Sequence, residues 1–163
     1  MLIGIISDIH DHTDNLRRAM KQLAEARCGR VLCLGDIAHL TTLHELLQAR
    51  FCKIELVAGN NDYPRADFAA ACAAVPGVTY HGETAELEID GKRIFMAHEP
   101  ERTLNAAEMG LFQAIFFGHT HRAGQMLMGQ TLIANPGDLQ GRYGNPSYAL
   151  YDTSDNSLRH VQL

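Results

Sequence analysis

The chain has 163 residues, of which 46% are hydrophobic and 20% are charged, and its formal net charge is −5 at pH 7. This length and composition are typical of one soluble globular domain, which we expect to span residues 1–163. The chain has no long basic run, and this argues against a nucleic-acid partner because such binding draws its strength from clustered Lys and Arg.

The compartment is indicated by what the sequence lacks. The N-terminal segment MLIGIISDIHD has no basic leader and turns acidic too soon for a signal peptide. No apolar run approaches the roughly 20 residues that cross a membrane. The four cysteines form no CxxC pair, which is typical of reduced, buried thiols. We therefore expect a cytoplasmic protein with no membrane partner.

The first half of the chain alternates buried strands with helices. The strands are continuous apolar runs, as in a sheet covered on both faces, and are expected at Leu2–Ile6, Val31–Leu34 and Cys52–Ala58. The helices are expected around Leu16–Ala24, with Thr13 or Asp14 as N-cap, and at Thr41–Arg50 and Asp67–Ala74. This order predicts a parallel sheet with right-handed crossovers.

The second half contains a β-hairpin and several short strands. Glu83–Ile89 alternates in polarity and pairs, through a turn at Asp90-Gly91, with Lys92–Ala97. A helix at Glu101–Met109 precedes a buried strand at Gln113–Phe117. Short strands complete the chain at Gln125–Met128, Thr131–Ala134, Ser147–Tyr151 and Leu158–Gln162. One α/β domain of two sheets flanked by helices fits this pattern best.

Five polar clusters each follow an apolar strand directly. They are Asp8-Ile9-His10, Gly35-Asp36, Gly59-Asn60-Asn61-Asp62, His98 and Gly118-His119-Thr120-His121. In open α/β sheets, ligands gather beyond the carboxyl ends of the strands, so we expect these clusters to converge on one crevice. Because alternate residues of an extended segment point the same way, the two side chains of each Asp-x-His or His-x-His pair can aim at one point.

The clusters contribute two Asp, one Asn and four His side chains as candidate metal ligands. Imidazole and carboxylate together suit first-row metals such as Mn, Fe, Co, Ni and Zn, whereas Mg prefers oxygen and water. Seven ligands are more than one ion needs, whereas two ions that share a bridging carboxylate can coordinate all seven. Such a pair, roughly 3.5–4 Å apart, lowers the pKa of bound water and neutralises phosphate oxygens during phosphoryl transfer.

The ordered motifs DxH, GD, GNxD, H and GHxH resemble those of the calcineurin-like metallophosphoesterases, in particular the small single-domain phosphodiesterases of bacteria and archaea. The resemblance extends from Leu2 to an NPGD stretch at Asn135–Asp138, where relatives usually carry NPGS. It implies a four-layer αββα sandwich, with two mixed β-sheets face to face and helices outside. It also implies two divalent transition-metal ions, with Mn favoured over Ni, Fe, Co or Zn.

The resemblance also implies a role for each ligand. The first metal ion would bind Asp8, His10 and His121, the second would bind Asn60, His98 and His119, and Asp36 would bridge the two. Residues assigned to catalysis are Asp36, Asn61 and Asp62, and those assigned to substrate binding are Asn61, His12 and Arg142. A solvated loop side chain is the competing interpretation of His12, and an exposed surface side chain that of Arg142.

Two departures from the family bear on the substrate. Asn61 stands where many larger relatives have a His that protonates the leaving oxygen. An amide donates a hydrogen bond but no proton, so we expect phosphodiesters to be better substrates than unactivated monoesters. The usual HGH is here His98-Glu99-Pro100, and the Glu99 carboxylate near the rim is expected to weaken acceptance of anionic substrates or to alter access.

Together the motifs predict a metal-dependent phosphoesterase, specifically a phosphodiesterase that cleaves a small phosphodiester with a hydroxide bound to a dinuclear metal centre. One alternative is a non-catalytic metal- or nucleotide-binding interaction protein on the same fold. Another is a sensor that binds a nucleotide and turns it over slowly. The completeness of the ligand set favours catalysis. A homodimer is an expectation carried over from relatives.

Overall fold

Four helices and eleven strands make up the computed structural model, which describes residues 1–163. The helices are α1 (Thr13–Glu25), α2 (Leu40–Leu46), α3 (Arg65–Ala73) and α4 (Glu101–Met109). The strands are β1 (Leu2–Ile6), β2 (Arg30–Cys33), β3 (Lys53–Leu56), β4 (Val78–Tyr80), β5 (Thr84–Ile89), β6 (Lys92–Ala97), β7 (Ala114–Phe116), β8 (Gly124–Met128), β9 (Thr131–Asn135), β10 (Ser147–Asp152) and β11 (Ser157–Gln162). None of the helices has the length and apolar character needed to span a bilayer.

The strands form two mixed sheets. The first sheet has the order β11-β10-β1-β2-β3-β4, in which β1 to β4 are parallel and β10 and β11 join through antiparallel pairs. The second sheet has the order β5-β6-β7-β9-β8, with β6, β7 and β9 parallel and an antiparallel strand at each edge. Parallel neighbours end at the same edge of a sheet, so each sheet presents a row of carboxyl ends.

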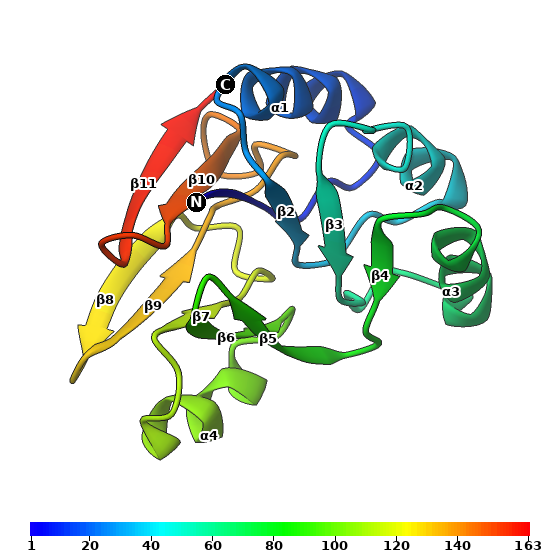
Figure 1. Ribbon diagram of the computed structural model, residues 1–163. Coiled ribbons are helices and arrows are strands. Elements are labelled where there is room, and N and C mark those ends of the chain that lie inside the picture. Colours follow the sequence, from blue (N-terminus) through cyan, green and yellow to red (C-terminus); the bar gives the residue numbers. More distant parts are fainter.

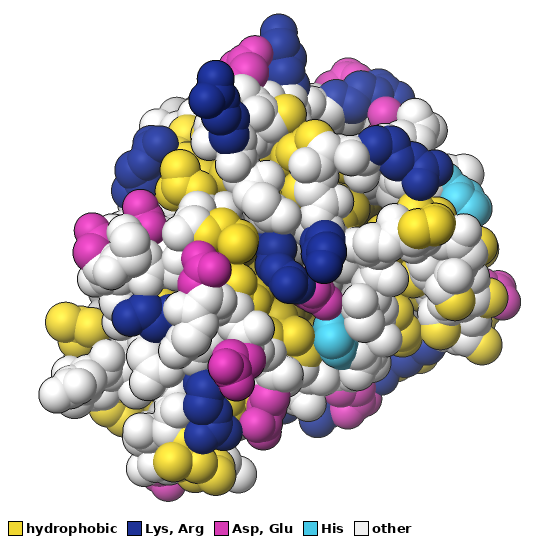
Figure 2. Space-filling view, viewed as in Figure 1, with side chains coloured by type: hydrophobic (Ala, Val, Ile, Leu, Met, Phe, Trp, Pro, Cys, Tyr) yellow, Lys and Arg dark blue, Asp and Glu magenta, His cyan; other side chains and the backbone are white.

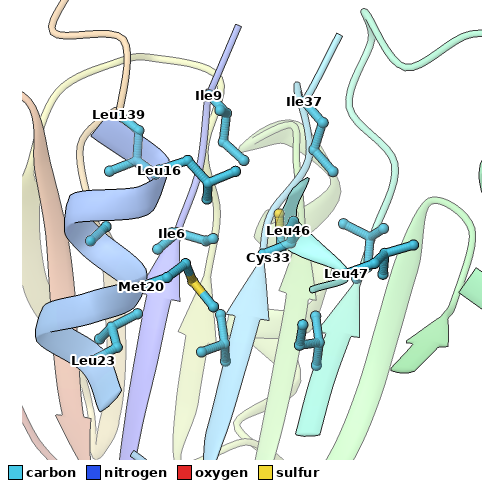
Figure 3. Packing of buried hydrophobic residues seen from close by; sticks show 14 of the residues in the cluster. Ile6, Ile9, Leu16, Met20, Leu23, Cys33, Ile37, Leu46, Leu47 and Leu139 are labelled. Atoms are coloured by element: carbon cyan, nitrogen blue, oxygen red, sulfur yellow. The ribbon is translucent and has the colours of Figure 1, made fainter. Parts of the chain in front are cut away.

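Helices cover the outer face of each sheet, and hydrophobic clusters fill the three interfaces between the four layers. Helices α1, α2 and α3 lie along the first sheet, and α4 lies on the opposite side of the molecule (Figure 1). In the cluster beneath the first three helices, Leu16, Met20 and Leu23 of α1 face the strands that carry Ile6 and Cys33 (Figure 3). This burial explains the apolar stripe of α1.

The interface between the two sheets is built around a pair of aromatic rings. Phe116 of β7 and Tyr151 of β10 are fully buried, and their ring centroids lie 5.2 Å apart at an interplanar angle of 68°. The Tyr151 hydroxyl donates a hydrogen bond of 2.6 Å to Asn156 Oδ1, which satisfies the polar end of this side chain inside an apolar layer. Beneath α4, Phe95 and Phe112 form a second pair at 5.4 Å.

Three details of the predicted elements are wrong. Helix α2 ends at Leu46 instead of Arg50. The backbone N–H groups that follow bond to carbonyls three residues earlier and not four, as in the bond from Ala49 N–H to the Leu46 carbonyl. The N-cap position of α1 is His12, which makes no side-chain capping bond. Strand β4 was not predicted, since three residues at the edge of a sheet carry too little periodicity to be recognised.

The inter-sheet core can be tested by removing one of its rings. Phe116→Ala is expected to lower the free energy of unfolding by about 3–5 kcal/mol, because two packed sheets close only partly around the cavity. Phe51→Ala is the matched control, and it should cost much less because that side chain is 40% exposed. Urea unfolding followed by circular dichroism measures both, and equal losses would contradict the assigned core.

Candidate metal centre

All five polar clusters meet at one place, beyond the carboxyl ends of strands from both sheets. Three clusters follow β1, β2 and β3 of the first sheet, and two follow β6 and β7 of the second. The sheets meet here directly, because Asp36 Oδ2 after β2 lies 3.4 Å from His98 Nε2 after β6. The expected convergence is therefore present, and the seven predicted ligand side chains form two contact groups joined by Asp36.

The first group consists of Asp8, His10 and His121. The distances from Asp8 Oδ1 to the Nε2 atoms of His10 and His121 are 3.8 Å and 3.5 Å. The two imidazoles stack with centroids 5.2 Å apart. Asp8 Oδ1 and His10 Nε2 are both buried without a hydrogen-bond partner. A buried polar atom without a partner costs about 1–3 kcal/mol, so these two atoms are suited to share a cation.

The second group consists of Asn60, His98 and His119. Asn60 Oδ1 lies 3.0 Å from His98 Nε2 and 2.9 Å from His119 Nδ1, and the two ring nitrogens are 3.3 Å apart. His98 is buried, whereas Asn60 and His119 are exposed. One oxygen and two imidazole nitrogens thus converge at a place that is open to solvent on one side.

Asp36 lies between the two groups. Its Oδ2 atom is 3.5 Å from His10 Nε2 and 3.4 Å from His98 Nε2. The backbone N–H and the side-chain amide of Asn61 donate to the two Asp36 oxygens at 2.8 Å and 2.7 Å. Burial favours the neutral carboxyl, but these donors and the His98 imidazole outweigh it and lower the pKa of Asp36 to about 2. The carboxylate is therefore ionised at neutral pH.

The spacing of the ligand atoms suits metal ions. Bonds of about 2.0–2.2 Å from Zn to nitrogen and oxygen place two atoms that share an ion roughly 3.0–3.5 Å apart. The two groups show separations of 2.9 Å to 3.8 Å. Two sets of three acidic or imidazole residues meet the geometric requirement for an ion, namely Asp8, His10 and His121, and Asp8, Asp36 and His98. The donor set and its geometry therefore fit a divalent metal.

The side chains converge for a different reason from the one expected. Five of the seven residues have left-handed backbone, with φ of 52° at Asp8, 43° at His10, 53° at Asp36, 66° at His119 and 58° at His121. The segments are tight turns and not extended strands, so the predicted alternation of side chains is wrong, although the predicted convergence is right. Left-handed backbone is unfavourable for residues with a Cβ, and such strain gathers at functional sites.

Two glycines let the motif loops touch one another. A Cβ at Gly59 would lie 2.1 Å from Asp36 Oδ1, and a Cβ at Gly118 would lie 2.0 Å from Ser7 Oγ. No side chain fits at these distances. The glycines of the GN and GH motifs are thus needed for the close approach of one cluster to another.

Two imidazoles are held by hydrogen bonds at the nitrogen that faces away from the centre. His98 Nδ1 lies 2.8 Å from the Leu34 carbonyl oxygen, which can only accept, so Nδ1 donates to it and Nε2 is the nitrogen that faces the centre. His121 Nδ1 lies 2.9 Å from Asp138 Oδ2 in the same arrangement. Asp138 was not among the predicted site residues, although the Asp in place of Ser in NPGD was a usable signal.

Asp62 faces the backbone and not the two contact groups. Its buried carboxylate accepts four hydrogen bonds of 2.7–3.0 Å, from the backbone N–H groups of Asp36, Ile37, Ala38 and Gly59. These amides belong to the loops after β2 and β3. The Asp62 side chain therefore joins the loop of Asp36 to the loop of Asn60.

The predicted substrate-binding residues differ in how closely they approach the centre. Asn61 contacts Asp36 directly. The backbone N–H of Arg142 donates to Asp138 Oδ2 at 2.8 Å, which links Arg142 to the centre through His121. His12 is exposed at the start of α1 and has no such link.

The Glu99 carboxylate is paired and not free at the rim. Arg102 lies 3.1 Å from Glu99 and 2.8 Å from Glu83, and Arg65 lies 2.6 Å from Glu83. Two positive and two negative side chains thus form a neutral network, so the expected repulsion of anionic substrates is offset. On the face shown in Figure 2, Lys and Arg are likewise scattered among Asp and Glu and form no continuous basic surface.

The connecting role of Asp62 leads to a stability prediction. Asp62→Asn places an amide N–H₂ against backbone donors, so it should lower the free energy of unfolding of the metal-free protein by about 1–3 kcal/mol. It should also weaken Mn binding, since Asp36 loses its support. Urea unfolding and calorimetry measure the two effects, with Asp14→Asn as control because that carboxylate is 92% exposed. Unchanged stability would contradict the connecting role.

Comparisons with known proteins match this chain to phosphoesterases over nearly its whole length. A family model described as the calcineurin-like phosphoesterase superfamily domain matches residues 1–156. A phosphodiesterase of Methanocaldococcus jannaschii is 28% identical over 166 residues, which cover 100% of this chain and 99% of that protein. The solved structure of an archaeal phosphodiesterase, also 28% identical, superposes with a TM-score of 0.93 and covers 100% of both chains.

More distant structures show the fold alone. The phosphoesterase Yfce from E. coli has a TM-score of 0.73 at 19% identity and covers 99% of both chains. Vps29 of Entamoeba histolytica, solved in complex with zinc, has a TM-score of 0.68 at 20% identity and covers 100% of this chain and 98% of its own. The predicted four-layer sandwich of two mixed sheets is confirmed. From its motifs, its fold and the family match over residues 1–156, this chain belongs to the calcineurin-like phosphoesterase superfamily.

Proposed function

We propose that this chain is a metal-dependent phosphodiesterase that acts on a small phosphodiester and holds two divalent ions. In this proposal the first ion binds Asp8, His10 and His121, the second binds Asn60, His98 and His119, and Asp36 bridges the two. Membership of the phosphoesterase superfamily supports a metal-dependent hydrolase, and the full-length similarity to an archaeal phosphodiesterase supports the reaction. The catalytic unit would be one domain of residues 1–163, since β11 completes the first sheet beyond the matched region.

The observation that carries the metal assignment is the pair of buried atoms without partners, Asp8 Oδ1 and His10 Nε2. A cation between them removes the cost of leaving both unsatisfied. His121 contacts Asp138 through Nδ1, and His98 contacts the Leu34 carbonyl oxygen through Nδ1. Each ring therefore directs its Nε2 atom toward the centre. Four imidazoles favour a first-row transition metal over Mg, and we take Mn as the first choice, with Ni, Fe, Co and Zn as alternatives.

The residues of the chain divide the remaining work. When bound, the ions would lower the pKa of an attacking water and neutralise charge on the phosphate oxygens. Asp8 and His98 are buried at the floor of the centre, while Asn60 and His119 are exposed, so substrate would approach from their side. Asp62 acts as a positioning residue in this account, because its oxygens are occupied by backbone amides.

The preference for a diester rests on Asn61. Its exposed side chain donates to the Asp36 carboxylate at 2.7 Å and has no proton to give a leaving oxygen. An unactivated monoester needs such a proton more than a diester with a good leaving group does. A homodimer stays a prediction, to be measured by light scattering.

The metal requirement can be tested with two aryl phosphates. Protein stripped of metal should be inactive and should regain hydrolysis of bis(4-nitrophenyl) phosphate with Mn, with 4-nitrophenyl phosphate cleaved more slowly. Asp36→Asn should lower kcat/KM on the diester by more than about 100-fold, beyond the 10–100-fold cost typical of residues around a metal site. Its circular dichroism should match that of the wild type. Metal-independent hydrolysis, or near-normal turnover and metal content in the variant, would contradict the assignment.

The role of Asn61 can be tested by supplying an acid. Asn61→His should raise the ratio of monoester to diester kcat/KM by at least about tenfold. This increase is smaller than the full effect of a general acid, because the position of the new imidazole is not optimised for proton transfer. Asn61→Gln is the control, since it retains an amide and should leave the ratio near that of the wild type. A ratio that does not respond to the imidazole would show that leaving-group protonation does not set the preference.

A further inference from the structure

A polar cavity of about 550 Å³ opens beside the metal centre. His121, a ligand of the first ion in the proposed function, forms part of its wall together with Asp138. The lining also includes Tyr143, Asn145 and Gln162. Pockets of 300–1,000 Å³ accept small organic ligands. The cavity therefore shares the His121 side chain with the proposed metal centre.

A tight turn brings an aromatic ring to the mouth of the cavity. The turn runs over residues 141–144, closed by a bond from the Gly144 N–H to the Gly141 carbonyl, and Gly141 has φ of +76°. Tyr143 at its tip is 62% exposed, and its ring stands nearly perpendicular to that of His121, with centroids 6.2 Å apart. The turn thus holds an exposed aromatic ring against a side chain of the metal centre.

Two positive side chains accompany this ring. The guanidinium carbons of Arg122 and Arg142 lie 5.1 Å and 5.5 Å from the centroid of Tyr143. Both arginines are exposed. A planar base can stack on such a ring or on a guanidinium plane, and the positive charge favours the phosphate to which the base is attached. The Tyr143 platform, as we call Arg122, Arg142 and Tyr143, therefore suits an aromatic group joined to an anion.

Two amide side chains in the lining of the cavity add hydrogen-bonding capacity. Asn145 Nδ2 donates to Gln162 Oε1 at 3.4 Å, which leaves the Asn145 oxygen to accept and the Gln162 N–H₂ to donate. A neighbouring acceptor and donor match the edge of a nucleobase, which presents the complementary pair. A purely apolar ester group would leave these amides unused.

We propose that this cavity binds the nucleoside of a nucleotide phosphodiester, with the base on the Tyr143 platform and the phosphate at the metal centre. The inference rests on the proposed function and narrows its substrate class. Asp138 connects the two parts, because its Oδ2 atom accepts from both His121 and the backbone N–H of Arg142. The loop that carries Tyr143 is thereby fixed relative to a metal ligand.

The test compares two diesters with the same leaving group, thymidine 5′-(4-nitrophenyl phosphate) and methyl 4-nitrophenyl phosphate. Wild-type protein with Mn should show a kcat/KM at least about tenfold higher on the thymidine ester, the effect expected of stacking on one aromatic side chain. Tyr143→Ala should bring the ratio of the two values close to one without lowering the rate on the methyl ester. Tyr143→Phe, which keeps the ring, should retain the wild-type ratio.

Tyr63→Ala is the matched control. Tyr63 is also 62% exposed and has an arginine over its ring, Arg65 at 5.2 Å, but it is not part of the cavity. This variant should keep the wild-type ratio. Equal kcat/KM on the two esters in the wild type, or an equal loss on both in Tyr143→Ala, would overturn the nucleoside site.

Calorimetry separates this inference from the proposed function. If neither ester is cleaved with any metal, the proposed phosphodiesterase is wrong. The binding affinities of thymidine 5′-monophosphate and methyl phosphate then test the nucleoside site independently of catalysis. Tighter binding of the nucleotide that disappears in Tyr143→Ala supports the site, and equal binding of the two phosphates overturns it.

Discussion

The Asp36 carboxylate is the point on which the arrangement of the site depends. It follows β2 of the first sheet, yet its Oδ2 atom lies within 3.5 Å of both His10 from the first sheet and His98 from the second. The two contact groups can share this oxygen only because the sheets pack face to face with their rows of carboxyl ends at the same side. The apolar layer between the sheets, with Phe116 against Tyr151, holds that relationship.

Keeping these polar groups together is unfavourable locally and is supported by the surrounding chain. Five of the seven candidate ligand positions have left-handed backbone, and Asp8 and Asp36 are almost fully buried. The opposing contributions come from backbone donors and from close packing. Asp62 uses its carboxylate on four amides, and Gly59 lets the loop after β3 contact Asp36 without a clash. A site strained in this way is stable only inside a fold that is fixed elsewhere.

Much of the fold could be predicted from local pattern. The hairpin strand Lys92–Ala97 and the helix Glu101–Met109 have the predicted bounds, because alternation, a turn signal and helical spacing are all encoded within a few residues. The five clusters were recognised for the same reason, since each directly follows an apolar run. The three-residue strand β4 lacks such a signal.

What could not be predicted depends on contacts between distant parts of the chain. The backbone N–H of His119 donates to Asp8, which is 111 residues away. Nothing in the local sequence at Asp8 indicates the left-handed backbone that this packing requires. The support of His121 by Asp138 and the approach of Tyr143 to His121 are likewise products of the fold. Residue types therefore indicated the chemistry, whereas the structure supplied the orientation of each side chain.

The central claim is that seven side chains form one site for two ions, and anomalous diffraction from a crystal of the Mn-loaded protein tests it most directly. The account predicts two anomalous peaks per chain. One should lie among Asp8, His10 and His121, the other among Asn60, His98 and His119, and the Asp36 carboxylate should contact both. A single peak, or peaks away from Asp36, would contradict the two-ion centre.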